Sequence, residues 1–86
     1  MIGEEIKKEI VDKLQNYIST GKKVHITTMP SAKFPKGKFY NCFINLISSD
    51  EKEIIVIDDV DGRILIKLSL IISPEDIEDY KELKNK

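Results

Sequence analysis

The sequence predicts a mainly β domain: a small five-stranded antiparallel barrel with an N-terminal α-helix and a short C-terminal helix. Three observations lead to this expectation. Apolar residues recur with helical spacing over residues 4–20, they alternate with polar residues over much of 23–73 as in half-buried strands, and a short charged segment follows from Pro74. A chain of 86 residues can build one modest core, so we expect residues 1–86 to form a single domain.

The N-terminal helix is expected over residues 4–20, because its apolar side chains fall on one stripe. Glu4 and Glu5 stand at the positive N-terminal end, and Gly21 can adopt the left-handed conformation that ends a helix. We expect the stripe to pack on the protein's own barrel; the alternatives are a partner protein and a membrane surface. The stripe consists of Ile6, Ile10, Leu14, Tyr17 and Ile18.

Residues 23–29 alternate as a half-buried strand does, with Val24, Ile26 and Thr28 on one face. His25, the only histidine, lies on the more polar face. It has no second metal ligand at a suitable spacing and no nucleophile that it could serve as a general base. We therefore expect a structural or solvent-facing role for His25.

Residues 30–37 are expected to form a loop, since two prolines cannot donate hydrogen bonds to a sheet and Gly37 adds freedom. Lysines here alternate with Phe34, and residues 22–49 contain five lysines and no acid. Single-stranded nucleic acids bind such segments by stacking bases on rings and placing phosphates near ammonium groups. The alternative is a solvated loop whose Phe34 folds back over the barrel edge. The lysines beside this ring are Lys33, Lys36 and Lys38.

Residues 38–48 are expected to form a long strand that bends sharply, because apolar side chains occupy both of its faces. Asn41 and Asn45 share a strand face with the aromatic residues Phe39 and Phe43. We expect these asparagines at a barrel rim or bulge, and the alternative is contact with a ligand. The single cysteine, Cys42, excludes an internal disulfide and a multi-cysteine zinc site. The expected core face consists of Tyr40, Cys42, Ile44 and Leu46.

The Asp61-Gly62 pair lies between two apolar runs and predicts a β-hairpin with a two-residue type I′ turn. The outer face of this hairpin, around Val56 and Leu65, would be too apolar to face water. It would need a cover from a helix or from another subunit. The core face of the expected hairpin consists of Ile55, Ile57, Ile64, Ile66 and Leu68.

The chain after the hairpin is expected to end in a short strand and a helix. Residues 69–70 interrupt the alternation, as a 3₁₀ turn before a final strand at 71–72 would. Ser73 then suits a helix N-cap, and Pro74 suits the first helical position. We expect a short, charged helix or tail over residues 74–86.

This order of elements resembles the Sm-like fold, the small SH3-like barrel of Sm proteins and bacterial Hfq, over residues 4–73. Residues 66–71, IKLSLI, look like the second Sm signature, in which a hydrophobic residue, a basic residue and usually a glycine precede the 3₁₀ step. Lys67 corresponds to the basic residue of that signature, and Leu68 stands where the glycine is expected. The turn at residues 48–52 lacks the Asp and Asn with which Sm proteins hold a uracil base.

The resemblance implies a homo-oligomer, because Sm-like chains pair the edge strand of one subunit with that of the next to form rings. We therefore expect an oligomeric binding or scaffold module, with RNA as its candidate ligand. A β-barrel that binds a partner protein and no nucleic acid is the alternative function. The residues that we expect to contact RNA are Lys33, Phe34, Lys36, Lys38 and Lys67.

Several other classes of function find no support in the sequence. Paired catalytic groups, a phosphate-binding loop and a metal-ligand cluster are all missing, so we expect neither an enzyme nor a bound cofactor. No apolar run approaches the roughly 20 residues that a membrane-spanning helix needs, and the N-terminus lacks the pattern of a signal peptide. We therefore expect a cytoplasmic protein without membrane contact.

Overall fold

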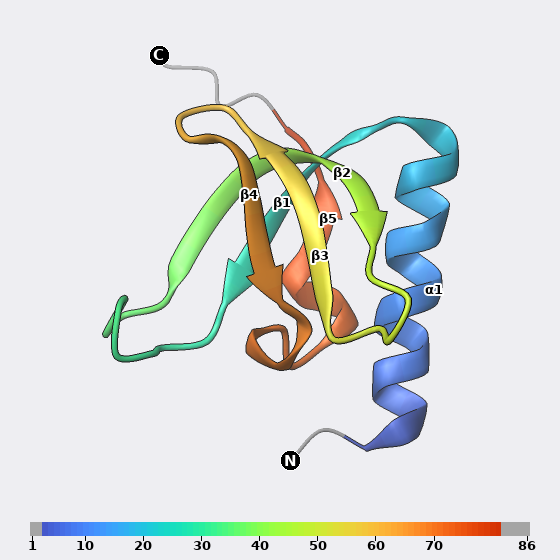
Figure 1. The fold of residues 1–86 in the computed structure, drawn as a ribbon, viewed down its shortest axis with the longest axis horizontal. Coiled ribbons are helices and arrows are strands. Elements are labelled where there is room, and N and C mark those ends of the chain that lie inside the picture. Colours follow the sequence, from blue (N-terminus) through green and yellow to red (C-terminus); the bar gives the residue numbers. More distant parts are fainter. Residues whose placement is uncertain (1–2, 82–86) are drawn as a thin grey trace.

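The computed structural model describes residues 3–81, which fold around one hydrophobic core (Figure 1). These residues form an α-helix, five β-strands and two short 3₁₀ helices. The expectation of a mainly β fold with five antiparallel strands and an N-terminal helix is confirmed. In chain order, the elements are α1 (Glu4–Thr20), β1 (Lys23–Thr28), β2 (Lys38–Ile47), β3 (Glu53–Asp58), β4 (Gly62–Lys67), η1 (Leu68–Leu70), η2 (Pro74–Asp76) and β5 (Ile77–Asp79).

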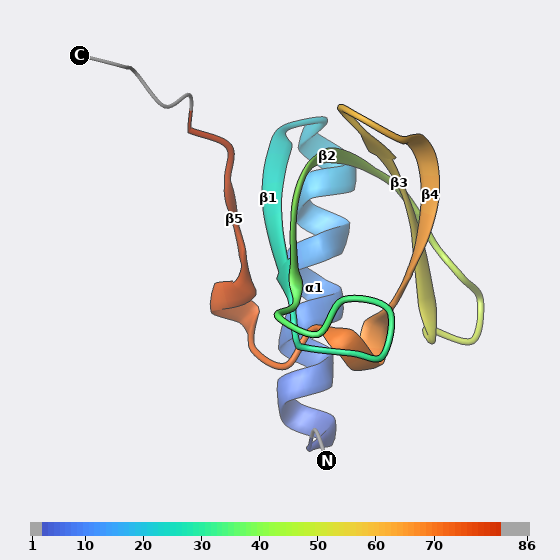
Figure 2. The same cartoon turned by 90° about the vertical axis from the view of Figure 1, so that its left-hand side faces the viewer.

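The strands form one sheet in the order β4-β3-β2-β1-β5. Figure 2 shows that the sheet curls strongly, but β4 and β5 stay at its two edges, so the expected barrel is not closed. The pairing of β2 with β3 shifts register between Ile44 and Leu46, which marks a β-bulge with Asn45 as the extra residue. The bulge changes which side chains point inward: Ile44 is buried, whereas Leu46, expected in the core, is 40% exposed.

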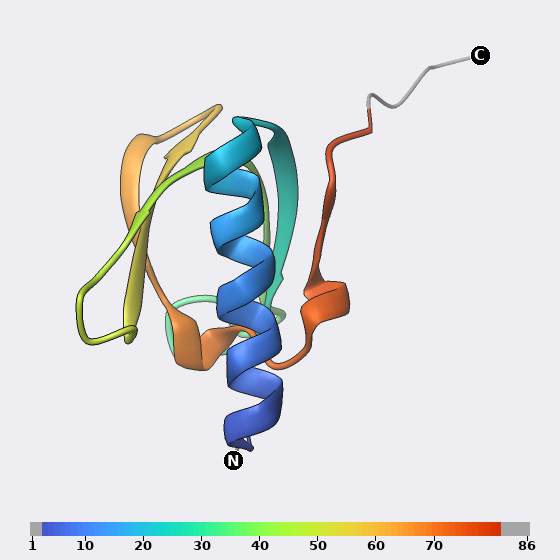
Figure 3. The same cartoon turned by 90° about the vertical axis from the view of Figure 1, so that its right-hand side faces the viewer.

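α1 lies across the open side of the curled sheet and closes the core there (Figures 2 and 3). The helix ends as expected, because Gly21 has φ 69° and donates its backbone N–H to the carbonyl oxygen of Tyr17 at 2.9 Å. The buried stripe is rotated from the expected one, since Ile6 is 40% exposed on a first turn that projects past the sheet (Figure 3). The buried residues of α1 are Ile10, Val11, Leu14 and Tyr17.

The β3–β4 hairpin has a longer turn than the sequence predicts. Asp58 pairs with Gly62, which leaves a three-residue loop, 59–61, in place of the expected two-residue turn. The Asp58 carboxylate stabilises this loop by accepting hydrogen bonds from the backbone N–H groups of Val60 and Asp61, both at 3.0 Å. Gly62 follows with φ 72°, the left-handed conformation that three-residue hairpin loops use.

The longer turn reverses the two faces of β3, because an odd shift in register moves each side chain to the opposite side of the sheet. Ile54 and Val56 are fully buried, whereas Ile57, expected in the core, is 41% exposed. β4 keeps its expected orientation, with Ile66 only 2% exposed. The expectation that Val56 lies on an outer face and needs a cover is therefore wrong.

The C-terminal segment also differs from its prediction. Pro74–Asp76 forms a single 3₁₀ turn, and Ile77–Asp79 then pairs with β1 as strand β5, where a helix was expected. Complete burial of Ile77 explains why this segment joins the sheet. The final strand expected at 71–72 is absent from the sheet of the described residues. The remainder of the expected helix, residues 82–86, lies outside the part of the chain that the structure describes.

Side chains of α1 and β1 hold the end of β5 in place. The hydroxyl of Tyr17 donates a hydrogen bond to Oδ1 of Asp79 at 2.6 Å. The backbone N–H of Lys81 donates to Nε2 of His25 at 3.0 Å. Burial, together with the hydrogen bond to Asp79, raises the pKa of Tyr17 to about 12. The C-terminal strand thus depends on contacts made across more than fifty residues of chain.

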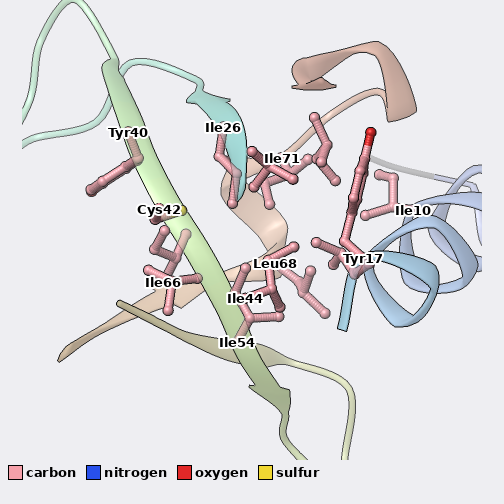
Figure 4. Close-up of a cluster of buried hydrophobic side chains, with 14 of the residues drawn as sticks. Ile10, Tyr17, Ile26, Tyr40, Cys42, Ile44, Ile54, Ile66, Leu68 and Ile71 are labelled. Carbon is pink, nitrogen blue, oxygen red and sulfur yellow. The ribbon is translucent and has the colours of Figure 1, made fainter. Parts of the chain in front are cut away.

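The core fills the space between α1 and the inner face of the sheet, as Figure 4 shows. Cys42 on β2 has no exposed surface, and burial raises the pKa of its thiol to about 12. A thiol that stays protonated and shielded is a packing group and a poor nucleophile. Ile71 is also fully buried, although it belongs to no strand.

The observed register gives a direct test of the hairpin. We expect Ile66→Ala to lower the free energy of unfolding by about 2–5 kcal/mol, because it leaves a cavity in the core. Ile57→Ala, the matched change on the outer face, should cost less than about 1 kcal/mol. Urea denaturation of both variants provides the measurement. Equal losses would contradict the three-residue turn.

The raised pKa of Tyr17 predicts a loss of stability at high pH. The unfolded chain releases the tyrosine proton near its ordinary pKa of 10, whereas the folded chain retains it up to about 12. The free energy of unfolding should therefore fall between these two pKa values. Tyr17→Phe should fall less steeply than wild type in urea denaturation across that range. Tyr80→Phe is the control for the same chemical change outside the core, and a slope as shallow as that of Tyr17→Phe would contradict the assignment.

Candidate functional site

The loop between β1 and β2 is folded tightly on itself. The backbone N–H groups of Ser31 and Gly37 both donate to the carbonyl oxygen of Phe34, at 2.9 and 2.8 Å. Gly37 has φ 80°, and a Cβ at this position would lie 2.4 Å from the carbonyl oxygen of Thr28. Only glycine fits there, because any side chain would collide with the backbone at the end of β1. The backbone of the loop therefore has a fixed conformation, from which its side chains project.

Two of the expected RNA-contacting lysines meet at one ring. The ammonium groups of Lys33 and Lys38 lie 5.6 and 4.7 Å from the centroid of the half-buried Phe34 ring. The ammonium of Lys38 also lies 5.0 Å from the ring centroid of Tyr40 and 3.4 Å from Oδ2 of Asp61. The structure thus brings Lys33, Phe34 and Lys38 together, and the turn between β3 and β4 offsets part of their charge.

The other two expected residues stand apart from this ring. Lys36 is exposed on the loop. Lys67 ends β4 opposite Glu53 and lines a cavity of about 690 Å³ beside α1 and η1. Lys67 therefore belongs to different surroundings from those of the loop lysines.

A cluster of rings on the outer face of the sheet was not predicted. The ring centroid of His25 lies 4.8 Å from that of Phe39 and 4.9 Å from that of Tyr80. The ammonium of Lys23 lies 4.4 Å from the Tyr80 ring centroid and 2.6 Å from Oδ2 of Asp59. The strand alternation could have placed His25 and Phe39 on one face. The contribution of Tyr80 was hidden because its segment was expected to be helical.

Hydrogen bonds define the state of the His25 ring. A backbone N–H can only donate, so the bond from Lys81 shows that Nε2 of His25 carries no proton. The proton therefore sits on Nδ1, which donates to Oδ1 of Asn41 at 2.5 Å. His25 links β1, β2 and the end of β5, which is the structural role expected for it. Asn45 lies at a bulge, as expected, but Asn41 does not: it stands in the regular β1–β2 pairing, opposite His25.

The outer face also exposes a group of apolar side chains on adjacent strands. Phe43 on β2 pairs with Ile57 on β3, and these side chains are 44% and 41% exposed. On β4, Leu65 is 53% exposed. Leu65 thus lies on the outer face of the hairpin, as the sequence predicts, but within one copy of the described chain it is not covered. Ile55 lies opposite it on β3, and Val56 is buried on the other face.

The turn between β2 and β3 carries negative charge. Hydrogen bonds from the Ser48 hydroxyl and the Lys52 backbone N–H to the Asp50 carboxylate lower the pKa of Asp50. Asp50 is therefore ionised at neutral pH, and its charge disfavours an approaching phosphate.

The described residues contain neither a metal-ligand cluster nor a membrane-spanning helix. Within residues 3–81, no group of three or more His, Cys, Asp or Glu side chains could hold a metal ion. No helix in this part of the chain has the length and apolar character needed to cross a membrane. Comparison of the chain with protein-family models, with curated proteins and with solved structures finds no match.

Proposed function

We propose that this chain is a non-enzymatic, Sm-like binding module that assembles with copies of itself through its strand edges and binds single-stranded RNA. The observed order of elements supports the resemblance, since a helix, a strand, a loop, a long bent strand, a hairpin and a 3₁₀ turn follow one another as expected. The observation that carries the proposal is the open sheet, with β4 and β5 at its two edges.

The hydrogen-bond pattern identifies the free groups on the β4 edge. The backbone N–H of Leu68 donates to the carbonyl oxygen of Lys52 at 2.8 Å, so this pair belongs to the bonded positions of the β3–β4 ladder. Bonded and non-bonded pairs alternate along an antiparallel ladder. The backbone groups of Arg63, Leu65 and Lys67 therefore point away from β3, toward the free edge.

The same reasoning applies to β5. The backbone N–H of Tyr80 donates to the carbonyl oxygen of Lys23 at 3.0 Å, so Ile77 and Asp79 direct their backbone groups away from β1. The N–H of Ile77 already donates to the carbonyl oxygen of Pro74, which leaves the Ile77 carbonyl oxygen and both backbone groups of Asp79 for an incoming strand. Unpaired edges of this kind recruit further strands. We propose that β4 of one copy pairs with β5 of the next.

A proline at Leu65 tests this assembly. Leu65→Pro removes an edge N–H that makes no bond within the chain, and proline is compatible with an edge strand at such a position. We expect light scattering to show a multiple of the chain mass for wild type and a monomer for Leu65→Pro, with similar circular dichroism spectra. Leu65→Thr is the matched control, because it removes the apolar side chain and keeps the N–H. A monomeric wild type, or an assembled Leu65→Pro, would refute edge pairing.

We propose that RNA binds at the loop between β1 and β2. Its lysines lie in a stretch without acids, and two of them surround Phe34. Ammonium groups beside an aromatic ring provide what a single strand needs: partners for its phosphates and a surface for its bases. Lys67 would contact the RNA only if the bound RNA strand also reaches the end of β4.

Removing the loop charges should weaken RNA binding and its dependence on salt. Each lysine that neutralises a phosphate contributes about −0.7 to the slope of log affinity against log salt on single strands. We expect the triple change of Lys33, Lys36 and Lys38 to Ser to reduce this slope by up to about 2. Fluorescence anisotropy with labelled oligouridine and oligoadenine provides the measurement.

The control for this experiment removes the same charge elsewhere, by changing Lys7, Lys8 and Lys52 to Ser. We expect this variant to keep the wild-type slope. Equal losses in the two triple variants would show that overall charge, and not the loop, determines binding.

The alternative function is a module that binds a partner protein and no nucleic acid. The exposed apolar group formed by Phe43, Ile57 and Leu65 favours this alternative, since such neighbouring side chains often mark protein contacts. If wild type retains neither oligonucleotide even at low salt, this alternative replaces RNA binding.

A further inference from the structure

A cavity of about 690 Å³ lies at the end of the molecule that contains the start of α1 and η1, the 3₁₀ helix that follows β4. Its walls come from segments far apart in the chain: the first half of α1, the residue after β1, the turn between β2 and β3, and η1. A volume of roughly 300–1,000 Å³ is typical of sites for small molecules. The cavity is separate from the Phe34 ring and from the outer face of the sheet.

The base of the cavity is apolar. Ile10 and Leu68 are only 2% and 5% exposed and belong to the core. Met29 and Ile72 also line the cavity and are 39% and 50% exposed. Two large apolar side chains that stay half in water around one hollow provide surface for the apolar part of a ligand.

The charges at the cavity favour an anion. Three lysines line it, Lys7, Lys52 and Lys67, against two glutamates. The salt bridges among residues 3–81 are those of Lys23 and Lys38, so no cavity lysine lies within 4.0 Å of a described carboxylate. The cavity lysines are therefore available for a negative group brought by a ligand.

Backbone hydrogen bonds hold the walls in position. Met29 donates its N–H to the carbonyl oxygen of Leu70 at 2.8 Å, which ties β1 to η1. Leu68 donates to the carbonyl oxygen of Lys52, also at 2.8 Å, which ties η1 to the turn. The N–H of Lys52 is in turn 3.0 Å from Oδ1 of Asp50. A cavity with connected walls is formed before any ligand arrives, which lowers the entropy cost of binding.

We propose that this cavity binds a small anion with an apolar body, such as a medium-chain fatty acid or an alkyl phosphate. The ammonium groups of Lys52 and Lys67 hold the carboxylate or phosphate, and the alkyl chain lies on Ile10, Met29 and Ile72. This site is distinct from the loop between β1 and β2, at which we place the proposed RNA binding.

The first experiment measures whether both parts of the ligand are needed. The full-length chain, in the assembly that it forms, is titrated with the fluorescent anion 8-anilinonaphthalene-1-sulfonate, and decanoate, decyl phosphate and decanol then compete for the site. We expect decanoate and decyl phosphate to displace the dye at least about tenfold more effectively than decanol. Shortening the alkyl chain of the carboxylate should weaken its binding by about fourfold for each methylene removed. If decanoate competes better than decyl phosphate, the ligand is a fatty acid. If decyl phosphate competes better, the ligand is an alkyl phosphate.

The second experiment locates the site. The double change of Lys52 and Lys67 to Glu should weaken decanoate at least about tenfold, because it reverses two charges at the cavity. The control is the double change of Lys8 and Lys22 to Glu, which alters the net charge equally at exposed positions outside the cavity. Ser69→Trp, which fills the cavity, should abolish dye binding while the circular dichroism spectrum stays unchanged.

Four results would overturn the proposal: no dye binding by wild type, competition by decanol as strong as that by decanoate, wild-type affinity of the Lys52 and Lys67 double variant, or an equal loss in its control. None of these results bears on RNA binding, which is measured with the loop variants.

Discussion

The structure depends on the burial of a sheet face that the sheet itself does not enclose. Because β4 and β5 do not meet, the inner side chains of the strands would face water on one side without α1. Leu14 of α1 is completely buried on the helix side of the core, and Ile54 and Val56 of β3 are completely buried on the sheet side. A domain this small has little apolar surface to spare. The helix is therefore part of the core, and the surfaces left for binding are the outer face, the loop between β1 and β2, and the cavity beside η1.

The elements that the sequence predicts correctly depend on local signals. The bounds of α1, the alternation of β1 and the position of η1 follow from spacing, from Gly21 and from an interrupted pattern within a few residues. The hairpin turn was predicted wrongly, because the side chain of Asp58 bonds to the backbone two and three residues later and makes a three-residue loop more favourable than the Asp-Gly turn. Since the faces of a strand alternate, that one local bond reassigned Ile57 from core to surface.

The errors at the C-terminus have a long-range cause. Ser73 and Pro74 are a good start for a helix, and the Ser73 hydroxyl does accept the N–H of Glu75 at 3.3 Å. The helix stops after one turn because Ile77 gains more by completing the core beside β1. No local pattern reports this contact.

The candidate site divides in the same way. Lys33, Phe34 and Lys38 are close in sequence and meet in space, so their association could be predicted. The ring cluster around His25 and the cavity at Lys67 combine distant segments and required the structure. The stretch of sequence without acids does have acidic residues near it in space, because the β3–β4 turn brings two carboxylates to its lysines.

The two edges of the sheet differ, since β4 has six residues and β5 has three. A contact between unlike edges is heterologous, so each copy joined in this way still offers one edge of each kind. Such a chain of copies ends only when rotation from one to the next returns to the starting point; otherwise it grows as a filament. The curl of the sheet sets the angle between its edges, and the β2 bulge at Asn45 contributes to that curl. The geometry of one extra residue inside a single subunit would then influence whether the assembly is a closed ring.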